Sequence, residues 1–235
     1  MLKPVTQEAA LTDRVRDAIL EAIVDGSLRP GERLAQARIA ENLGVSRQPV
    51  SHALSVLKEQ GIVVELGRKG LTVVPIDAAH VRHLYQVRGA LDALAARLAA
   101  ERVKSGQADA RSLDELQVMV QTNGRSRATA GQQVDADIAF HTAIYALSAN
   151  PILQELARPH WVQFRRCMLT VLEDDDIRAD VWPEHDKILA AIVNGDANSA
   201  ASAAQQHTHR AGESTAARLM QQPDVLTRPL EENDS

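Results

Sequence analysis

Four side chains in the second half of the sequence have the types and the spacing of a metal site. Asp137 and His141 are four residues apart, so they share one face of a predicted helix. That face is otherwise apolar, as are the faces that carry His185 and His207, and all four groups should point into a helical core. One imidazole in such a place is more often a core histidine bonded to backbone or water. Three imidazoles and a carboxylate together predict a site for a divalent metal ion, with Zn expected and Ni or Mn as alternatives.

His209 competes with His207 for this role, because the two are close in the sequence. Their side chains differ by about 200° around a helix. Only His207 continues a stripe of small residues formed by Ala200, Ala203 and Ala211. We therefore expect His207 to face the site.

A charged group is also predicted in the core at Arg88. It lies on an apolar stripe together with Leu84 and Leu91, so its guanidinium needs a partner. Two interpretations remain open from the residues alone. Arg88 could form an ion pair with Asp92 four residues later, or it could bind the carboxylate of a small effector.

Composition limits the class of protein. The 235 residues exceed the ~100 to 200 of a typical domain, which predicts two domains. An Ala- and Leu-rich chain with only 3% aromatic residues favours a mainly α fold. The single cysteine, Cys167, excludes an internal disulfide and is expected to be a small buried hydrophobe. No stretch approaches the ~20 apolar residues that span a bilayer, so we expect a cytoplasmic protein without membrane contact.

The helices that position the polar groups must come from residues 77–220. This region has no strand signal and predicts an all-helical bundle of about six helices. Turn-forming residues separate the predicted helices at Gly106, 123–131, Asn150-Pro151, 173–176 and Asn194-Gly195. The polar residues 221–235 are expected to form a disordered tail.

The first 76 residues predict a winged helix-turn-helix. Three helices are expected, and the turn between the second and the third has only three residues. Ser46 can cap the third helix, which runs to Gln60. Two β-branched segments, 62–66 and 71–75, then flank a turn as a hairpin. This hairpin would be the wing, and its tip is basic.

The outer face of the third helix has the polar residues that reading DNA requires. Arg47 could make a bidentate contact to guanine, and Gln48 could bind adenine. Ser51 and His52 lie on the same side, near the end of the helix that would enter the major groove. An ordinary solvated face is the alternative, but the helix-turn-helix and the basic wing beside it favour DNA.

Further cations would contact DNA phosphates. They are Arg38 from the preceding helix and the wing residues Arg68 and Lys69. Residues 1–76 carry a net charge of +1 and residues 77–235 a net −6, so the overall −5 belongs to the second half. Because one such domain makes few contacts, we expect a homodimer on a pseudo-palindromic, double-stranded operator.

Two stretches of the first half closely resemble the N-terminal domain of GntR-family regulators. They are Ile23–Leu34, with the sequence IVDGSLRPGERL, and Ile39–Val50, with the sequence IAENLGVSRQPV. The second half resembles the FCD type of sensor domain in that family. The matching segments are Val87-Arg88, Asp137–His141, Ala149-Asn150, Glu184-His185 and Gly195–His207.

The resemblance implies a metabolite-responsive transcriptional regulator, in which residues 77–220 form the ligand-sensing and dimerisation domain. It points to the same four metal ligands, and to Arg88 and Asn150 as contacts of a small organic acid. That acid would complete the metal shell, prefer one arrangement of the dimer and so change operator affinity. One departure concerns Ser51-His52, which stands where the family usually has Arg-Glu. Since an Arg contact to guanine gives ~1 to 3 kcal/mol of discrimination, the usual family operator cannot be assumed.

Two other functions compete with this interpretation. A metal-dependent enzyme would use an open metal position to activate water, but only Glu184 offers a general base and no nucleophile accompanies the set. A DNA-binding protein with a purely structural metal site is the third possibility. We expect a regulator without enzymatic activity.

Overall fold

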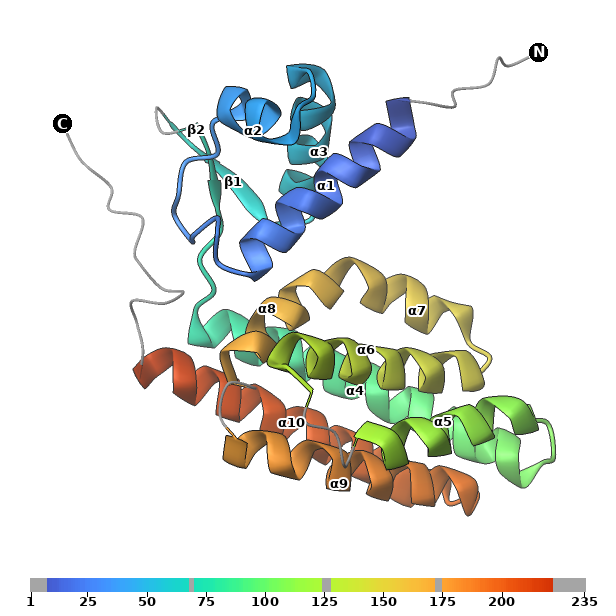
Figure 1. Cartoon of the computed structure of the whole chain (residues 1–235). Helices are drawn as coiled ribbons and strands as arrows, with labels where there is room; N and C mark the ends of the chain where they lie inside the picture. The colour runs from blue at the N-terminus through green and yellow to red at the C-terminus, as the bar shows by residue number, and fades with distance from the viewer. Residues whose placement is uncertain (1–7, 68–69, 124–127, 172–174, 222–235) are drawn as a thin grey trace, which may run out of the picture. The chain divides into compact units, whose positions relative to one another are not determined.

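The computed structural model describes residues 8–67, 70–123, 128–171 and 175–221. These residues divide into two compact units, whose boundary in the sequence lies between Ile76 and Asp77. The regular structure in the described ranges is helical apart from one two-stranded hairpin and an isolated bridge, which confirms the mainly α fold (Figure 1). Within these ranges, no helix combines the length and the apolar character that a bilayer span requires.

The first unit has the element order of a winged helix-turn-helix. Its elements are α1 (Glu8–Val24), α2 (Gln36–Leu43), α3 (Arg47–Glu59), β1 (Val63–Leu66) and β2 (Gly70–Val73). The turn between α2 and α3 begins at Gly44, whose φ of 64° closes α2 in the left-handed region that glycine tolerates. Ser46 occupies the N-cap position of α3, although its side chain makes no capping hydrogen bond.

Burial divides α3 as the sequence predicted. Pro49, Val50, Ala53, Leu54 and Leu57 are buried, whereas the polar residues of the opposite side are exposed. Strands β1 and β2 pair in antiparallel register, from Val63 opposite Val73 to Leu66 opposite Gly70. Residues 31–34 run beside β2 of this hairpin. Leu34 N–H donates to Leu71 O at 2.8 Å, and Arg33 forms an isolated antiparallel β-bridge with Thr72. The hairpin is thereby held against the start of α2.

The described part of the second unit contains seven α-helices rather than about six. They are α4 (Ala78–Lys104), α5 (Ala110–Asn123), α6 (Ala130–Leu147), α7 (Pro151–Ala157), α8 (Trp161–Val171), α9 (Asp175–Val193) and α10 (Ala197–Gln221). The additional helix arises because a 3₁₀ turn, Arg158–His160, separates α7 from α8. Pro159 lies in that turn, and a proline lacks the N–H that would continue the α-helix.

Helix α10 packs along α4 at the centre of this unit (Figure 1). A glycine permits their close approach, since a Cβ at Gly212 would lie only 2.7 Å from Tyr85 Cβ. Asp77 caps α4 by accepting from His80 N–H at 2.7 Å. Helix α6 begins in a capping box formed by Thr129 and Gln132. These contacts set the ends and the spacing of the helices that carry the polar groups.

Candidate metal centre

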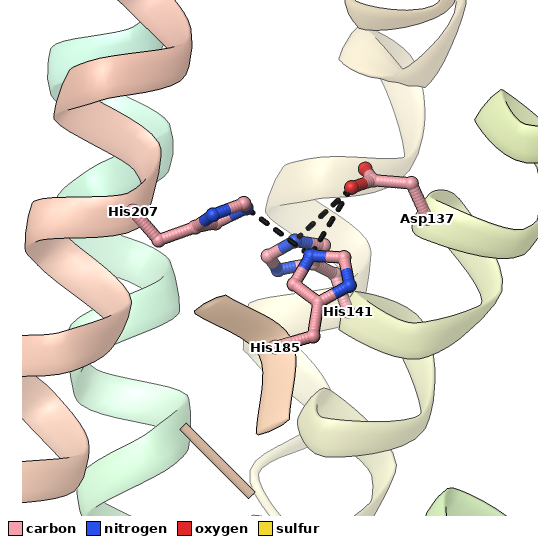
Figure 2. Close-up of side chains that lie close together, drawn as sticks. All are labelled: Asp137, His141, His185 and His207. Carbon is pink, nitrogen blue, oxygen red and sulfur yellow. Dashed lines mark hydrogen bonds and ion pairs between the residues drawn. The ribbon is translucent and has the colours of Figure 1, made fainter. Parts of the chain in front are cut away.

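The structure brings together the four residues predicted as metal ligands. Helix α6 supplies Asp137 and His141, α9 supplies His185 and α10 supplies His207 (Figure 2). All four residues are buried, and one potential ligand atom from each lies within 4.8 Å of the others. Three helices therefore direct three imidazoles and one carboxylate to one point.

The distances between these atoms suit a first-row metal ion. His185 Nε2 lies 3.2 Å from Asp137 Oδ1 and 3.2 Å from His207 Nε2. His141 Nε2 lies 3.8 Å from the same Oδ1. In a tetrahedral zinc site with bonds of about 2.0 to 2.1 Å, two nitrogen ligands are about 3.3 Å apart. The cluster is thus close enough for all four residues to hold one ion.

Two carboxylates behind the histidines orient their rings. His207 Nδ1 lies 2.8 Å from Glu184 Oε2, and His141 Nδ1 lies 3.4 Å from Asp92 Oδ2. Because a carboxylate only accepts, the proton of each ring belongs on Nδ1, which leaves the Nε2 lone pair directed at the cluster. His141 Nε2 is buried without any hydrogen-bond partner. A metal ion would satisfy that atom.

His185 is held in a different way. Its ring stacks on Phe140, with centroids 4.2 Å apart, and meets the edge of Trp182 at 4.8 Å. Its Nδ1 is buried and has no hydrogen-bond partner. Packing against aromatic rings, rather than a carboxylate, therefore sets its orientation.

The pKa shifts in the cluster favour the protonation states that bind metal. Burial lowers the pKa of His141, His185 and His207, so the imidazoles are neutral at pH 7. Burial alone would raise the pKa of Asp137, but His141, the hydrogen bond from His185 and the charge of Arg88 hold it well below the usual carboxyl range. Neutral imidazoles and an ionised carboxylate are the ligand forms that a divalent cation needs.

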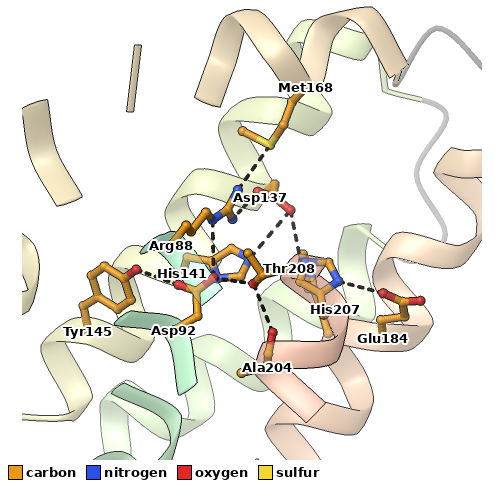
Figure 3. A network of polar contacts seen from close by, with 11 residues as sticks. Arg88, Asp92, Asp137, His141, Tyr145, Met168, Glu184, Ala204, His207 and Thr208 are labelled. Carbon is orange, nitrogen blue, oxygen red and sulfur yellow. Dashed lines mark hydrogen bonds and ion pairs between the residues drawn. The ribbon is translucent and has the colours of Figure 1, made fainter. Parts of the chain in front are cut away.

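Arg88 lies beside the cluster and is buried, as its apolar stripe predicted. Its Nη2 lies 3.2 Å from Asp137 Oδ2 and its Nε lies 3.3 Å from Asp92 Oδ2 (Figure 3). The ion pair with Asp92 is the first of the two interpretations left open by the sequence. Three aromatic rings surround the guanidinium, with centroids 5.1 to 5.7 Å from Cζ, and they belong to Tyr85, Trp161 and Phe164.

Asp92 is a polar centre that the sequence reasoning recognised only as a partner of Arg88. Besides its contacts with Arg88 and His141, it accepts from Tyr145 Oη at 2.6 Å and from Thr208 Oγ1 at 2.7 Å. These donors come from α4, α6 and α10 (Figure 3). The sequence pointed to two of these partners, because Arg88 is four residues from Asp92 and His141 belongs to the predicted metal site. Nothing in the sequence pointed to Tyr145 and Thr208, because both lie on ordinary core faces of their helices.

The remaining predicted residues of this unit have local roles in the structure. Asn150 caps α7, because its Oδ1 accepts from Ile152 N–H at 3.2 Å. His209 is exposed, in contrast to His207. Cys167 is buried, and burial raises the pKa of its thiol to about 12, in agreement with the expected hydrophobic role.

The first unit presents its predicted DNA-binding residues on its surface. Arg47, Gln48, Ser51 and His52 are all exposed on α3. Arg38 is exposed as well, but its Nη2 lies 2.7 Å from Glu32 Oε1, so a carboxylate already offsets its charge. The other two predicted phosphate contacts, Arg68 and Lys69, lie outside the described residues, as do residues 222–235 of the predicted tail.

Comparison with family models identifies both units. The model for bacterial regulatory proteins of the gntR family matches residues 11–73, and the FCD domain model matches residues 83–210, which is more than half of the 235-residue chain. The chain therefore belongs to the GntR family, in the group that carries an FCD domain. It is accordingly a DNA-binding transcriptional regulator of this type.

Two curated proteins that match most of this chain are transcriptional regulators. The Uxu operon transcriptional regulator of Escherichia coli is 28% identical, over 88% of this chain and 87% of its own length. The transcriptional regulator LutR of Bacillus subtilis is 28% identical, over 90% of this chain and 99% of its own.

Solved structures share the fold. Escherichia coli McbR/YncC covers 95% of this chain and 100% of its own, with a TM-score of 0.68 at 23% identity. A putative transcriptional regulator GntR from Rhodococcus sp. RHA1 covers 88% of this chain and 98% of its own, with a TM-score of 0.69 at 24% identity.

Proposed function

We propose that this chain is a metabolite-responsive regulator, which binds a pseudo-palindromic operator as a homodimer and senses a small organic acid at a metal site. The observation that carries the proposal is the convergence of three neutral imidazoles and one ionised carboxylate inside the FCD unit. A buried polar cluster of this kind is costly unless its atoms are satisfied, and one metal ion would satisfy all four.

Zinc is the ion that we infer, with nickel and manganese as alternatives. The three nitrogens and one oxygen of His141, His185, His207 and Asp137 are common zinc ligands. When bound, such an ion would act as a Lewis acid that holds an oxygen atom of an added carboxylate. The carboxylates of Asp92 and Glu184 would keep two of the ligand rings in the required tautomer.

Arg88 is the residue that we assign to the carboxylate of the effector. Its Nη2 contacts Asp137 Oδ2, while Asp137 Oδ1 faces the histidines. A carboxylate that reached the metal would therefore lie next to the guanidinium, which binds such groups through paired hydrogen bonds. The family resemblance suggested Asn150 as a second contact of the effector. The Oδ1 atom of this side chain already accepts from Ile152 N–H as the cap of α7, and a contact with an effector remains a prediction.

Helix α4 offers a route from the site to DNA binding. It carries Arg88 and Asp92, and its N-cap, Asp77, is the first residue after the boundary between the units. A ligand that drew Arg88 away from Asp92 would change the contacts of this helix with α6 and α10. Regulation follows if the ligand prefers one arrangement of the dimer, because its differential affinity then shifts the equilibrium.

The test is thermal unfolding of the full chain, zinc-loaded and chelator-treated, against a panel of mono-, di- and tricarboxylates. A ligand at 100 times its dissociation constant should stabilise its site by about 2.7 kcal/mol. We expect at least one acid to raise the melting temperature of the zinc-loaded protein only. The same acid should change the affinity of the protein for a DNA duplex that it binds.

The other outcomes separate the competing functions. If chelation lowers the melting temperature but no acid has any effect, the site is structural and the sensing proposal fails. If the zinc-loaded chain converts an acid to a product, this outcome supports the enzyme interpretation against the sensing proposal. If zinc neither binds nor stabilises the protein, the three histidines are core residues and the metal proposal is wrong.

A further inference from the structure

The DNA-binding unit has a polar hollow between its third helix and its hairpin. Its volume is about 450 Å³. Helix α3 contributes Ser51, Ser55 and Lys58, and the hairpin contributes Glu65 and Gly70. The opposite side is formed by Arg33, in the segment before α2, and by Gln36, the first residue of α2.

The cations near this hollow differ in their partners. Lys58 Nζ lies 2.6 Å from Glu65 Oε2, and Arg38 outside the hollow is paired with Glu32 at 2.7 Å. Arg33 is exposed and forms no ion pair with any residue in the described ranges. Its Nε would lie 3.9 Å from a Cβ placed on Gly70, so the side chain reaches the end of the hairpin where Leu66 pairs with Gly70. Arg33 therefore brings an uncompensated positive charge to the hollow.

The geometry of duplex DNA indicates what would enter this space. A helix such as α3 reads the major groove, and a wing enters the neighbouring minor groove. One sugar-phosphate strand separates the two grooves, so it must cross between the helix and the wing. The hollow occupies that position on this unit, because Ser51 and Ser55 of α3 line one side and Gly70 of the hairpin lines the other.

We propose that this hollow binds a backbone phosphate of duplex DNA, with Arg33 as its principal cation. The hydroxyls of Ser51 and Ser55 can donate to the same phosphate. Ser51 then contacts the DNA backbone instead of a base edge. Glu65 opposes the contact, both by its own charge and by holding Lys58. The proposal rests on the winged-helix mode of DNA binding and goes beyond it by assigning this phosphate contact to Arg33 rather than to Arg38.

The experiment measures binding of the full chain to a fluorescent, mixed-sequence duplex of about 30 base pairs, at roughly 50 to 200 mM salt. Each lost phosphate contact should reduce the slope of log affinity against log salt by about 0.9. We expect R33Q to show that reduction and several-fold weaker binding at the lowest salt. The matched variant R38Q should change the slope less, because Glu32 already offsets Arg38.

A second variant predicts the opposite sign. E65Q removes the acid from the hollow and frees Lys58, so binding should become tighter and its salt dependence steeper. Arg33, Arg38 and Glu65 are exposed, and melting temperatures of the variants will check that each is folded. If the wild-type chain binds the duplex and R33Q shows the same slope of log affinity against log salt, the assignment of the phosphate contact to Arg33 is wrong, while the DNA-binding mode stands. Absence of salt-dependent duplex binding by the wild-type chain overturns the DNA-binding mode together with it.

Discussion

The two units place their charged groups in opposite environments. In the DNA-binding unit the predicted contact residues on α3 are exposed, and the ion pair of Arg38 is at the surface. In the FCD unit Arg88, Asp92 and Asp137 are almost completely buried. Exposed charges are worth little to the fold and remain free to meet DNA, whereas buried charges need every partner that they have. A substitution should therefore affect ligand binding alone in the first unit, and both binding and folding in the second.

The largest expected effect is the loss of metal binding in H207A. This substitution removes one of the four ligand atoms, and the affinity for zinc should fall by more than the roughly 10- to 100-fold that a change behind a ligand costs. Competition with a chromophoric chelator measures it. H209A is the control on the same helix, because His209 is exposed and its removal should leave the zinc affinity unchanged. Equal losses in both variants would show that His207 is not a ligand.

A comparison of two arginines tests the difference between the units directly. In the metal-free protein, R88M leaves the carboxylates of Asp92 and Asp137 without their buried cation, and it should lower the free energy of unfolding by about 3 to 5 kcal/mol. R38M breaks only the exposed pair with Glu32 and should cost about 0 to 1 kcal/mol. Urea unfolding of both variants gives the two values. Similar values would contradict the proposed distinction.

The buried histidines predict a pH dependence of the metal-free protein. Burial lowers the folded-state pKa of His141, His185 and His207 below the ordinary 6.5. Below about pH 6.5 the unfolded chain therefore takes up more protons than the folded chain, and stability is lost as the pH falls. The loss should reach up to about 1.4 kcal/mol per pH unit for each histidine. Asp92 and Asp137, with lowered pKa values, add to it only near and below their ordinary 3.8.

Urea unfolding at about pH 7.5, 6.5 and 5.5 measures this dependence. H209Q should keep it, because the exposed histidine does not belong to the buried cluster. A free energy of unfolding that stays constant over this interval would mean that the three imidazoles are solvated in the metal-free state.

The smallest effect concerns the contact between α4 and α10. In G212A the new Cβ would lie 2.7 Å from Tyr85 Cβ, so the variant should lose about 1 to 3 kcal/mol through overpacking. In G89A the nearest atoms are those of Thr208 at 3.8 Å, which is ordinary contact. Alanine is the better helix former by about 1 kcal/mol, so G89A should be neutral or stabilising. Thermal unfolding distinguishes the two, and equal shifts would contradict the close approach at Gly212.

Periodicity was sufficient to predict the parts of the molecule that depend on one helix at a time. The apolar stripes around Asp137, His185 and His207 predicted that these groups face inward, and the structure places them in one cluster. The buried and exposed sides of α3 follow from the same argument. The role of the cluster as a metal site remains a prediction, because periodicity shows where a side chain points and not what it binds.

Contacts between distant segments were beyond this reasoning. Asp92 is separated from Tyr145 by 53 residues and from Thr208 by 116. The pair of Arg38 and Glu32 joins α2 to the non-helical segment before it, where helical spacing gives no guidance. Pro159 does indicate a break between α7 and α8. A proline is also tolerated in the first turn of a helix, so this residue alone did not show whether one helix is interrupted or a new helix begins.

The surroundings of Asp92 also constrain how this protein can evolve. The carboxylate accepts from Tyr145 and Thr208 and contacts Arg88 and His141, so its replacement by a neutral residue removes the acceptor of several buried donors at once and leaves Arg88 with the carboxylate of Asp137. No single compensating change restores them, since the partners lie on three helices. In related sequences, position 92 and these four positions should consequently change together or not at all.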